Sequence, residues 1–361
     1  MNPPLKKILV TGGAGFIGTN FIRYALRKRP DWLIYNLDAL TYAGNPSNLS
    51  DLSGDAAERY RFFQEDIRHR EFLDAFFQKE LFDGVFHFAA ESHVDRSILG
   101  PEAFVETNVL GTFRLLEASL AIWKKRQDPD FRFLHVSTDE VYGSLGEDGF
   151  FTETTPYDPS SPYSASKAGS DHLVKAYHRT YGLPVLVTNC SNNYGPYQFP
   201  EKLIPLMILH IIERKTLPVY GDGGNIRDWL FVEDHCEALI RVFENGRAGE
   251  TYNIGGSAEY RNLEIVHTLC RLLDKRLNRG QEDSRQLIRL VADRPGHDRR
   301  YAIDATKIRT ELGWTPQFGF EDGIKQTVEW YLTHMDWVDS VRSGKYREWI
   351  EANYTRRDKG E

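Results

Sequence analysis

Two pairs of side chains in this sequence have the spacing that proton transfer requires. Tyr163 and Lys167, in the segment SPYSASKAGS, are four positions apart and therefore share one face of a helix. An ammonium group beside a phenol favours the phenolate, which lowers the pKa from its usual value of about 10 and makes Tyr163 a usable base. Asp139 and Glu140 are neighbours in HVSTDEVYG, directly after an apolar run, where carboxyl groups can move protons. Thr138, just before them, can donate its hydroxyl to the same substrate oxygen as Tyr163.

Both pairs also have an ordinary structural interpretation. A Tyr-x-x-x-Lys pair occurs on many surface helices, and two acids after a strand can cap its end or pair with nearby arginines. Thr138 can likewise be a β-branched strand residue without a function. The choice depends on whether the sequence also provides a site for a cofactor that accepts hydride.

The segment KILVTGGAGFIGTNFIRYAL has the features of such a site. An apolar, strand-like run is followed by closely spaced glycines and then by a helix-like stretch. Glycines at these positions permit a tight turn and a close approach of the backbone to a pyrophosphate, while free N–H groups at the helix start attract the anion. The glycines that fit G-x-G-x-x-G, or the overlapping G-x-x-G-x-x-G, are Gly12, Gly13, Gly15 and Gly18.

An acidic residue follows this motif at the distance typical of NAD-binding proteins. Asp38 ends the apolar run LIYNLD, twenty residues after Gly18, where its carboxylate can bond a ribose hydroxyl. The carboxylate would repel a 2′-phosphate and no arginine follows it directly, so we expect NAD rather than NADP. The positive nicotinamide ring would further favour the phenolate of Tyr163. Asp66, in QEDI, could hold the adenine edge or be a solvated acid in a turn.

The first half of the chain alternates apolar runs with amphipathic stretches. The apolar runs end in small or polar residues, and the segments between them repeat apolar residues every three or four positions. The strand-like runs are KILVTGG, LIYNLD, YRFFQEDI, GVFHFAA, FRFLHVST and LPVLVTNC. This alternation predicts an α/β fold with a Rossmann-type, doubly wound parallel sheet, whose ligands gather at the carboxyl ends of the strands.

The alternation becomes irregular after about residue 195, where segments rich in Gly, Pro and aromatic residues begin. We therefore expect an NAD-binding domain at residues 1–195 and a smaller, substrate-binding α/β domain at residues 196–361. The amphipathic stretch VEDHCEALIRVFENG predicts a helix that returns to the first domain, in a segment near residues 225–250.

Composition and charge narrow the possible partners. The chain has 361 residues, with 45 basic and 52 acidic side chains and a formal charge of −7, so neither nucleic acid nor an anionic membrane is an expected partner. The N-terminal MNPPLKKILVTGG lacks the apolar stretch of a signal peptide, and no segment approaches the roughly 18 apolar residues that span a bilayer. Cys190, Cys236 and Cys270 are few and far apart, which favours reduced thiols over disulfides or a metal site. We therefore expect a cytoplasmic protein without a metal.

Taken together, the motifs resemble those of the extended short-chain dehydrogenase/reductase family, in its nucleotide-sugar branch. The glycine motif, Tyr163-x-x-x-Lys167 and STDEVYG carry this resemblance. Longer blocks, spread from about residue 8 to residue 304, are similar more narrowly to the dTDP-glucose 4,6-dehydratase family of hydro-lyases. These blocks are HFAAESHVDRS, VSTDEVYG, YSASKA, SNNYGPYQFPEKLIP, GDGGNIRDWLFVEDH, YNIGG and DRPGHDRRYAID.

The resemblance implies a dehydration that uses NAD without net oxidation. Oxidation at C4 of dTDP-glucose acidifies the hydrogen on C5, so that a carboxylate can remove it while an acid protonates the departing C6 hydroxyl. Hydride then returns to C6 and a proton to C5, which yields dTDP-4-keto-6-deoxyglucose without net oxidation. The resemblance assigns Asp139 as the acid and Glu140 as the base, whereas the residues alone leave the two roles open.

The resemblance also implies which residues hold the cofactor and the substrate. Asn193 would lie by the nicotinamide, and Tyr220 would offer an aromatic surface to the nucleobase. Apart from the resemblance, His93 and His297 could each be a hydrogen-bonded filler, and for His93 we expect that role. One arginine guanidinium can bind two phosphate oxygens at once, so Arg227 and Arg294 are candidates for binding the diphosphate. The implied cofactor contacts are Gly12, Gly15, Phe16, Ile17, Gly18, Asp38, Thr41, Asp66, Ile67, Ala89, Ala90, Thr107, Tyr163, Lys167 and Asn193. The implied substrate contacts are Ser92, Thr138, Asn192, Lys202, Leu203, Pro218, Val219, Tyr220, Arg227, Asn262, Arg294 and His297.

Related activities compete with this interpretation. A 4-epimerase would use the same tyrosine and cofactor but has no need of Asp139 and Glu140, and a GDP-mannose 4,6-dehydratase usually prefers NADP. A UDP-glucose 4,6-dehydratase is harder to separate, because thymine and uracil differ by one methyl group, worth only about 1–3 kcal/mol in a pocket. A regulatory or scaffold protein that has lost its chemistry would not need to keep this whole set together: Thr138, Asp139, Glu140, Tyr163 and Lys167.

The resemblance further suggests a homodimer that forms through helices of the first domain. The segments FVETNVLGTFRLLEASLAIW and SDHLVKAYHRTY could supply two helices from each subunit to a four-helix contact.

Overall fold

The apolar runs of the first half lie side by side in one parallel sheet, as expected. The computed structural model describes residues 5–280 and 282–342. Its large sheet consists of β1 (Lys6–Thr11), β2 (Trp32–Asp38), β3 (Tyr60–Gln64), β4 (Gly84–His87), β5 (Arg132–Thr138), β6 (Val185–Cys190) and β10 (Thr251–Ile254). The spatial order is β10-β6-β5-β4-β1-β2-β3, and every neighbouring pair is parallel. This order confirms the Rossmann-type fold, in which ligands bind where the order reverses, between β1 and β4.

Strand β10 was not among the expected strands, because TYNIGG is a short run without clear alternation. It lies at the edge of the sheet and pairs only its four residues with β6. A sequence pattern of this length cannot distinguish a strand from a loop.

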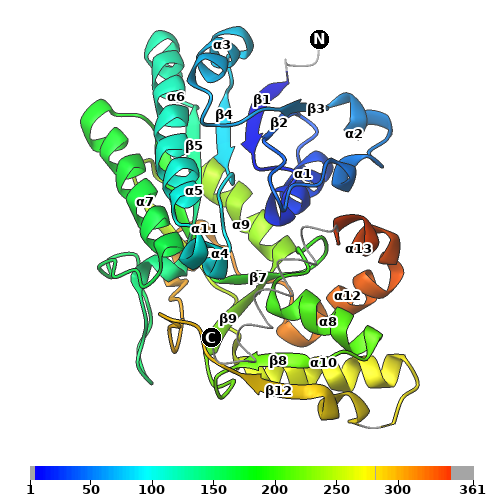
Figure 1. Ribbon diagram of the computed structural model, residues 1–361. Helices are drawn as coiled ribbons and strands as arrows, with labels where there is room; N and C mark the ends of the chain where they lie inside the picture. The colour runs from blue at the N-terminus through cyan, green and yellow to red at the C-terminus, as the bar shows by residue number, and fades with distance from the viewer. Residues whose placement is uncertain (1–4, 281, 343–361) are drawn as a thin grey trace.

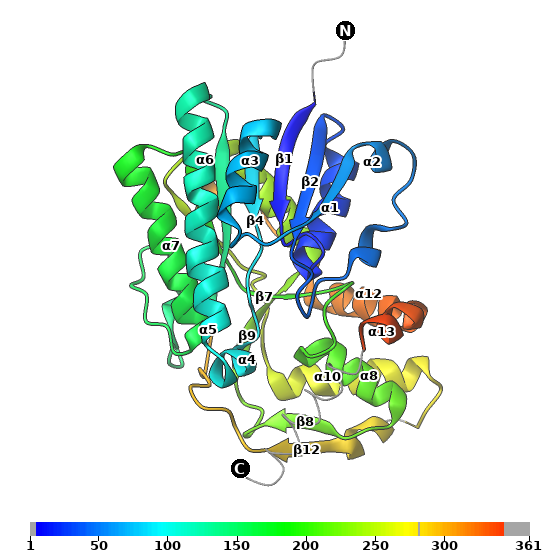
Figure 2. The ribbon, with the colours of Figure 1, turned by 45° about the horizontal axis from the view of Figure 1, so that its top comes forward.

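Amphipathic helices cover both faces of the large sheet (Figures 1 and 2). On one face, apolar side chains of α3, α6 and α7 pack against the strands in one buried cluster. On the other face, α1, α9 and α11 form a second cluster with them. The helices of this part of the molecule are α1 (Phe16–Lys28), α2 (Gly54–Glu58), α3 (Arg70–Glu80), α4 (Val94–Leu99), α5 (Glu102–Phe104), α6 (Thr112–Arg126), α7 (Pro162–Tyr181), α9 (Val232–Asn245) and α11 (Thr306–Leu312).

A smaller lobe lies at the carboxyl ends of the parallel strands (Figure 2). It contains a three-stranded sheet of β7 (Asn192–Tyr194), β9 (Ile226–Phe231) and β11 (Glu259–Arg261), and a two-stranded sheet of β8 (Leu217–Tyr220) and β12 (Ile288–Val291). Its helices are α8 (Leu203–Glu213), α10 (Asn262–Arg276), α12 (Phe320–Thr333) and α13 (Met335–Val341). Their apolar faces form a third buried cluster, separate from the two beside the large sheet.

The chain passes between the two lobes more than once. After the three-stranded sheet has begun, α9 packs against α1, β10 extends the large sheet, and α11 packs against β10 and α9. The large sheet is therefore completed by segments that follow part of the smaller lobe in sequence. Within the described ranges, no helix combines the length and the apolar character that crossing a membrane requires.

Candidate active site

The glycines between β1 and α1 have different structural roles. Gly12 has a φ of +72°, and a Cβ at this position would lie 2.7 Å from two backbone atoms of Ala89. A Cβ on Gly18 would lie 2.3 Å from the Gly12 carbonyl oxygen, so Gly18 allows α1 to pack against the turn. A Cβ on Gly15 would meet that same oxygen at a more tolerable 3.3 Å, and Gly15 lines a cavity. Because Gly15 caps α1 without a side-chain hydrogen bond, the first N–H groups of the helix are available to an anion such as a pyrophosphate.

Asp38, at the end of β2, is hydrogen-bonded to this glycine turn. Its Oδ2 accepts a hydrogen bond of 2.9 Å from the Ala14 backbone, and its Oδ1 accepts one of 2.8 Å from the Leu40 backbone. Burial raises the pKa of this carboxyl group, and the two backbone donors act in the opposite direction. Each carboxylate oxygen retains a second lone pair, which a ribose hydroxyl can use. The turn and the acid together fit a dinucleotide.

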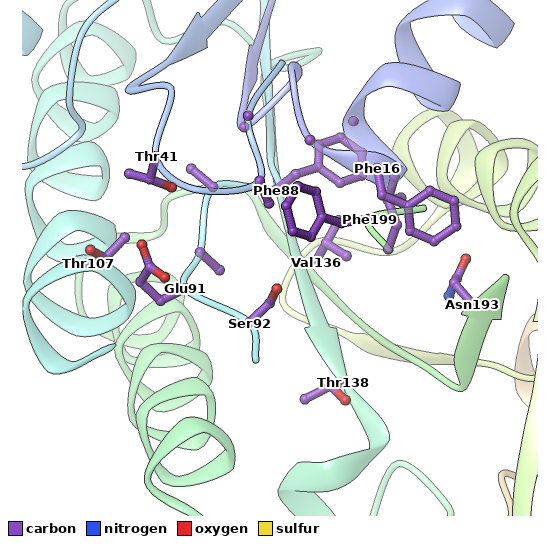
Figure 3. A pocket seen from close by; sticks show the side chains of 18 of the residues that line it. Phe16, Thr41, Phe88, Glu91, Ser92, Thr107, Val136, Thr138, Asn193 and Phe199 are labelled. Carbon is purple, nitrogen blue, oxygen red and sulfur yellow. The ribbon is translucent and has the colours of Figure 1, made fainter. Parts of the chain in front are cut away.

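A cavity of about 300 Å³ extends from the glycine turn along the carboxyl ends of the parallel strands. Figure 3 shows Thr41 and Thr107 on one side of it and Phe16 on the other. Thr107 belongs to a π-helical segment, Val105–Gly111, a rare conformation that is frequent at functional sites. The next residue, Asn108, bonds both backbone groups of Glu91, at 2.9 and 3.0 Å, and so fixes the loop after β4 beside the cavity.

Three residues predicted to act on the substrate follow one another at the end of β5. Asp139 and Glu140 begin a 3₁₀ turn, Asp139–Tyr142, directly after the last strand residue, Thr138. The Thr138 hydroxyl accepts a hydrogen bond from the Glu140 backbone and donates one to Asp139 Oδ1, both at 3.3 Å. Figure 3 shows the Thr138 side chain at this strand end. The turn brings both carboxyl groups to the same cavity as the predicted cofactor contacts.

The two carboxyl groups have different electrostatic surroundings. Burial, reinforced by the charges of Glu140 and Asp228, raises the pKa of Asp139 well above its ordinary value. Burial also raises the pKa of Glu140, but Arg294 and Lys202 oppose this shift. Asp139 is therefore the better candidate for a protonated acid and Glu140 for a charged base, the separation that two neighbouring carboxyl groups need for different roles.

Helix α7 brings Tyr163 and Lys167 to the same cavity. Ser161 and Ser164 form a capping box at the start of the helix, with a proline at its first position, so its N-terminus is well defined by the local sequence. The ammonium of Lys167 donates a 2.9 Å hydrogen bond to the carbonyl oxygen of Val136 on β5.

Two effects in the structure oppose the lowering of the Tyr163 pKa that was expected from Lys167 and the nicotinamide ring. Burial raises the pKa of Tyr163 well above its ordinary value, and the negative charge of Glu140 adds to this shift, whereas a hydrogen bond with Thr138 acts against it. Lys167 is directed at the Val136 carbonyl group on β5. A lower pKa at Tyr163 thus needs a further positive charge, which a nicotinamide ring would provide.

A second cavity, of about 150 Å³, adjoins the first and contains the predicted diphosphate ligands. Glu140, Asn192, Glu201 and Lys202 line both cavities. The Arg227 guanidinium lies 4.1 Å over the Tyr301 ring and donates a 2.9 Å hydrogen bond to the Asp298 carbonyl oxygen. Arg294 Nη1 lies 3.6 Å from Asp95 Oδ1. Despite the acidic composition of the chain, buried cations are concentrated here.

Strand β8 contributes Pro218, Val219 and Tyr220 to the lining of the second cavity. The Tyr220 hydroxyl donates a 3.1 Å hydrogen bond to Asp95 Oδ2, and its ring packs edge-on against His297 at 6.1 Å. An apolar wall with one oriented aromatic ring suits a nucleobase.

All the predicted contacts line one of these two cavities. The cofactor set lines the first, including Asp66, whose carboxylate also holds the Arg68 guanidinium at 2.8 Å. The substrate set is divided between the first and the second. His93 also lines the second cavity, and burial holds its pKa well below the ordinary value.

Several cavity residues were missed by the sequence analysis. Tyr42 and Phe199 line the first cavity, Glu201 lines both, and Asp95 and Tyr301 line the second. Asp95 and Tyr301 lie inside the blocks HVDRS and DRRYAID, so the blocks themselves were the available signal. Nothing in the local pattern distinguishes these residues from ordinary surface or core positions.

Comparisons with known proteins agree with this geometry. The model of the family described as GDP-mannose 4,6 dehydratase matches residues 9–327. The dTDP-glucose 4,6-dehydratase of Xanthomonas campestris pv. campestris (strain B100) is 59% identical over 345 residues, which cover 94% of this chain and 97% of that protein. The Shigella flexneri protein of the same name is 57% identical over 360 residues, covering 96% of this chain and 99% of the relative.

A solved structure extends the likeness to three dimensions. The dTDP-glucose 4,6-dehydratase from Streptomyces venezuelae, crystallised with NAD bound, is 47% identical and superposes with a TM-score of 0.85 over 93% of this chain and 99% of that one. Matches of this extent include both cavities and the strand end that carries the paired acids. The chain therefore belongs to the dTDP-glucose 4,6-dehydratase family.

Proposed function

We propose that this protein converts dTDP-glucose into dTDP-4-keto-6-deoxyglucose and water, with NAD as its cofactor. The names of its relatives and the NAD bound to a solved neighbour support this lyase activity. When bound, NAD supplies the acceptor for the C4 hydride and the donor that returns it to C6. The glycine turn and Asp38 would hold its pyrophosphate and adenosine ribose.

The residues around the cavity would move the protons. Tyr163 takes the proton of the C4 hydroxyl while Thr138 donates a hydrogen bond to the same oxygen, and Lys167 stabilises the phenolate. Glu140 then removes the acidified hydrogen from C5. Asp139 protonates the C6 hydroxyl, which departs as water. Glu140, whose proton can exchange with solvent, returns a proton to C5 and so completes the product.

One observation carries this proposal: Asp139 and Glu140 end β5 in the cavity that Tyr163 and Lys167 also line. An oxidation at C4 followed by simple re-reduction, as in a 4-epimerase, needs Tyr163 but has no use for two further carboxyl groups. Their separate electrostatic surroundings support an acid and a base that act on neighbouring carbons.

The second cavity supports a nucleotide-sugar substrate. Arg227, Arg294 and Lys202 would neutralise the diphosphate, and Tyr220 with Val219 would contact the nucleobase. An apolar contact to the thymine methyl group is worth about 1–3 kcal/mol, so a preference of roughly 10–200-fold over the uridine nucleotide is expected.

The decisive experiment is incubation of the purified protein with dTDP-glucose or UDP-glucose in heavy water, without added NAD. We expect a product that has lost the elements of water and carries one solvent deuterium at C5, formed faster from dTDP-glucose. A product of unchanged mass with inverted C4 would instead indicate an epimerase. Faster turnover of UDP-glucose would reassign the nucleotide but leave the reaction in place.

We also propose a homodimer formed through α6, α7 and the segment before α6. The π-helical segment and α6 expose Val105 and Phe113 at 55% and 37%, and α7 exposes Tyr181 at 45%. Helices α6 and α7 lie side by side on one face of the large sheet (Figure 1). Phe113→Glu should shift the mass measured by light scattering from two chains to one; an unchanged mass with a stable fold would exclude this surface.

A cytoplasmic location is supported by the state of the cysteines. Cys190, Cys236 and Cys270 are all buried and unpaired. Free buried thiols suit a reducing compartment, where disulfides are rare.

A further inference from the structure

Helix α7 continues the series of functional residues beyond Lys167. Tyr163, Lys167 and Asp171 recur every fourth position and therefore lie on one helical face, directed at the sheet. Asp171 is fully buried, yet it has no part in the proton transfers proposed above. Its Oδ2 accepts hydrogen bonds from the Ser137 hydroxyl at 2.8 Å and from the Tyr157 hydroxyl at 2.9 Å.

His135, on β5, lies between Asp171 and Lys167. Its Nε2 is 3.2 Å from Asp171 Oδ1 and 3.3 Å from Lys167 Nζ. Burial lowers the pKa of His135 well below its ordinary value, so the ring is neutral. Without hydrogen on Nε2 the ring can accept a hydrogen bond from the Lys167 ammonium, and it makes no hydrogen bond to Asp171 Oδ1. The charge of Lys167 and the hydroxyl groups of Ser137 and Tyr157 favour the ionised Asp171 carboxylate and oppose the effect of its burial.

Among the described residues, the other titratable groups that interact with the Lys167 ammonium carry no net charge. They come from each element packed against it: His135 on β5, His87 on β4, and Cys190 on β6. Burial lowers the pKa of both imidazoles and raises that of the Cys190 thiol, so all three are neutral near pH 7. Burial also lowers the pKa of Lys167, to about 8, and the charge of Asp171 acts against this loss.

We propose that Asp171 is a positioning residue whose buried carboxylate is the counter-charge that keeps Lys167 protonated beside Tyr163, with the neutral His135 ring lying between them. Without this charge the buried amine would lose its proton near neutral pH and could no longer stabilise a phenolate at Tyr163. The importance of that phenolate rests on the proposed function, whereas the charge state of Lys167 does not.

The direct test measures the pKa of Lys167. The holoenzyme is labelled with ¹³C at lysine Cε, the Lys167 signal is assigned with Lys167→Arg, and the chemical shift is followed against pH. Asp171→Asn should lower the pKa of Lys167 by about 1–3 units, the usual effect of an adjacent opposite charge. Glu117→Gln is the matched control, because it removes a carboxylate that bonds Tyr177 elsewhere on α7 and should leave the pKa of Lys167 unchanged.

Turnover provides the second readout. The alkaline limb of the C4 oxidation rate, measured as reduced cofactor in a single turnover, should move to lower pH in Asp171→Asn by the same number of units, with KM for dTDP-glucose unchanged. If Asp171→Asn fails to fold, Ser137→Ala combined with Tyr157→Phe withdraws two donors and should produce a smaller shift in the same direction. An unchanged pKa of Lys167 in a folded variant would overturn the proposal. If Asp171→Asn shifts the pKa of Lys167 but the parent protein has no dehydratase activity, the proposal for Asp171 stands and the proposed function is rejected instead.

Discussion

Alanine at Gly12 should damage the fold, whereas alanine at Gly15 should damage the cofactor site. A non-glycine residue in the left-handed conformation of Gly12 costs about 1–2 kcal/mol. Its Cβ would also press on two backbone atoms of Ala89 at 2.7 Å, and forced contacts of this kind typically cost about 1–3 kcal/mol. Together these effects amount to about 2–5 kcal/mol, a large part of the roughly 5–15 kcal/mol that stabilises an ordinary fold.

The same substitution at Gly15 meets neither obstacle. Its φ of −80° suits any residue, and the nearest atom to a new Cβ is the Gly12 carbonyl oxygen at 3.3 Å. Replacing a glycine in an accessible conformation restricts the unfolded chain and stabilises by about 0.4–1 kcal/mol, which offsets the tight contact. The methyl group would occupy the space in which a pyrophosphate should approach the backbone, and we expect NAD affinity to fall at least tenfold, about 1.4 kcal/mol.

Urea unfolding of the cofactor-free variants and NAD titrations by tryptophan fluorescence separate the two effects. Gly12→Ala should unfold at much lower urea, while Gly15→Ala should unfold close to the parent protein but require much more NAD for saturation. Equal unfolding midpoints for the two variants would refute the inference that the fold requires glycine at Gly12 more than at Gly15. Unchanged NAD binding in Gly15→Ala would refute the position of the pyrophosphate.

Other perturbations test the chemistry step by step. Tyr163→Phe should slow the first oxidation by about 10²–10⁴-fold, measured as reduced cofactor in a single turnover. Glu140→Gln should still reduce the cofactor but incorporate no solvent deuterium at C5, and normal incorporation would remove Glu140 from the role of base. Burial, with Glu140 and Asp228, raises the pKa of Asp139, and an acid works only below its pKa; activity should therefore fall as pH rises through that raised value. Asp228→Asn should lower the pKa of Asp139 and so move the alkaline limb of the kcat profile to lower pH. If the limb stays where it is, deprotonation of Asp139 is not the cause of the loss of activity.

Those parts of the site whose geometry is local could be predicted from the sequence. The glycine turn, the acid that ends β2 and the helix that carries Tyr163 and Lys167 each depend on residues a few positions apart. Parallel strands then bring their carboxyl ends to one edge, so Asp38 and Asp139 line the same cavity although a hundred residues separate them.

Contacts between residues that are far apart in the chain could not be predicted from the sequence. Asp95 reaches Tyr220 and Arg294 across the two lobes, and no periodicity in the sequence encodes that meeting. The effect of burial on the pKa of Tyr163 could not be predicted either, because the spacing of Tyr163 and Lys167 specifies a shared helical face but neither the degree of burial nor the direction of the ammonium.

The placement of β10 has a consequence for how this protein can be divided. An N-terminal fragment ending near residue 195 would retain the glycine turn, Asp139 and Tyr163, but β6 would lose its outer neighbour and α1 would lose α9. An open strand edge beside uncovered apolar helices promotes aggregation. The cofactor-binding half is therefore not an independent module: during synthesis on the ribosome it must wait for residues beyond 250 before its sheet can close.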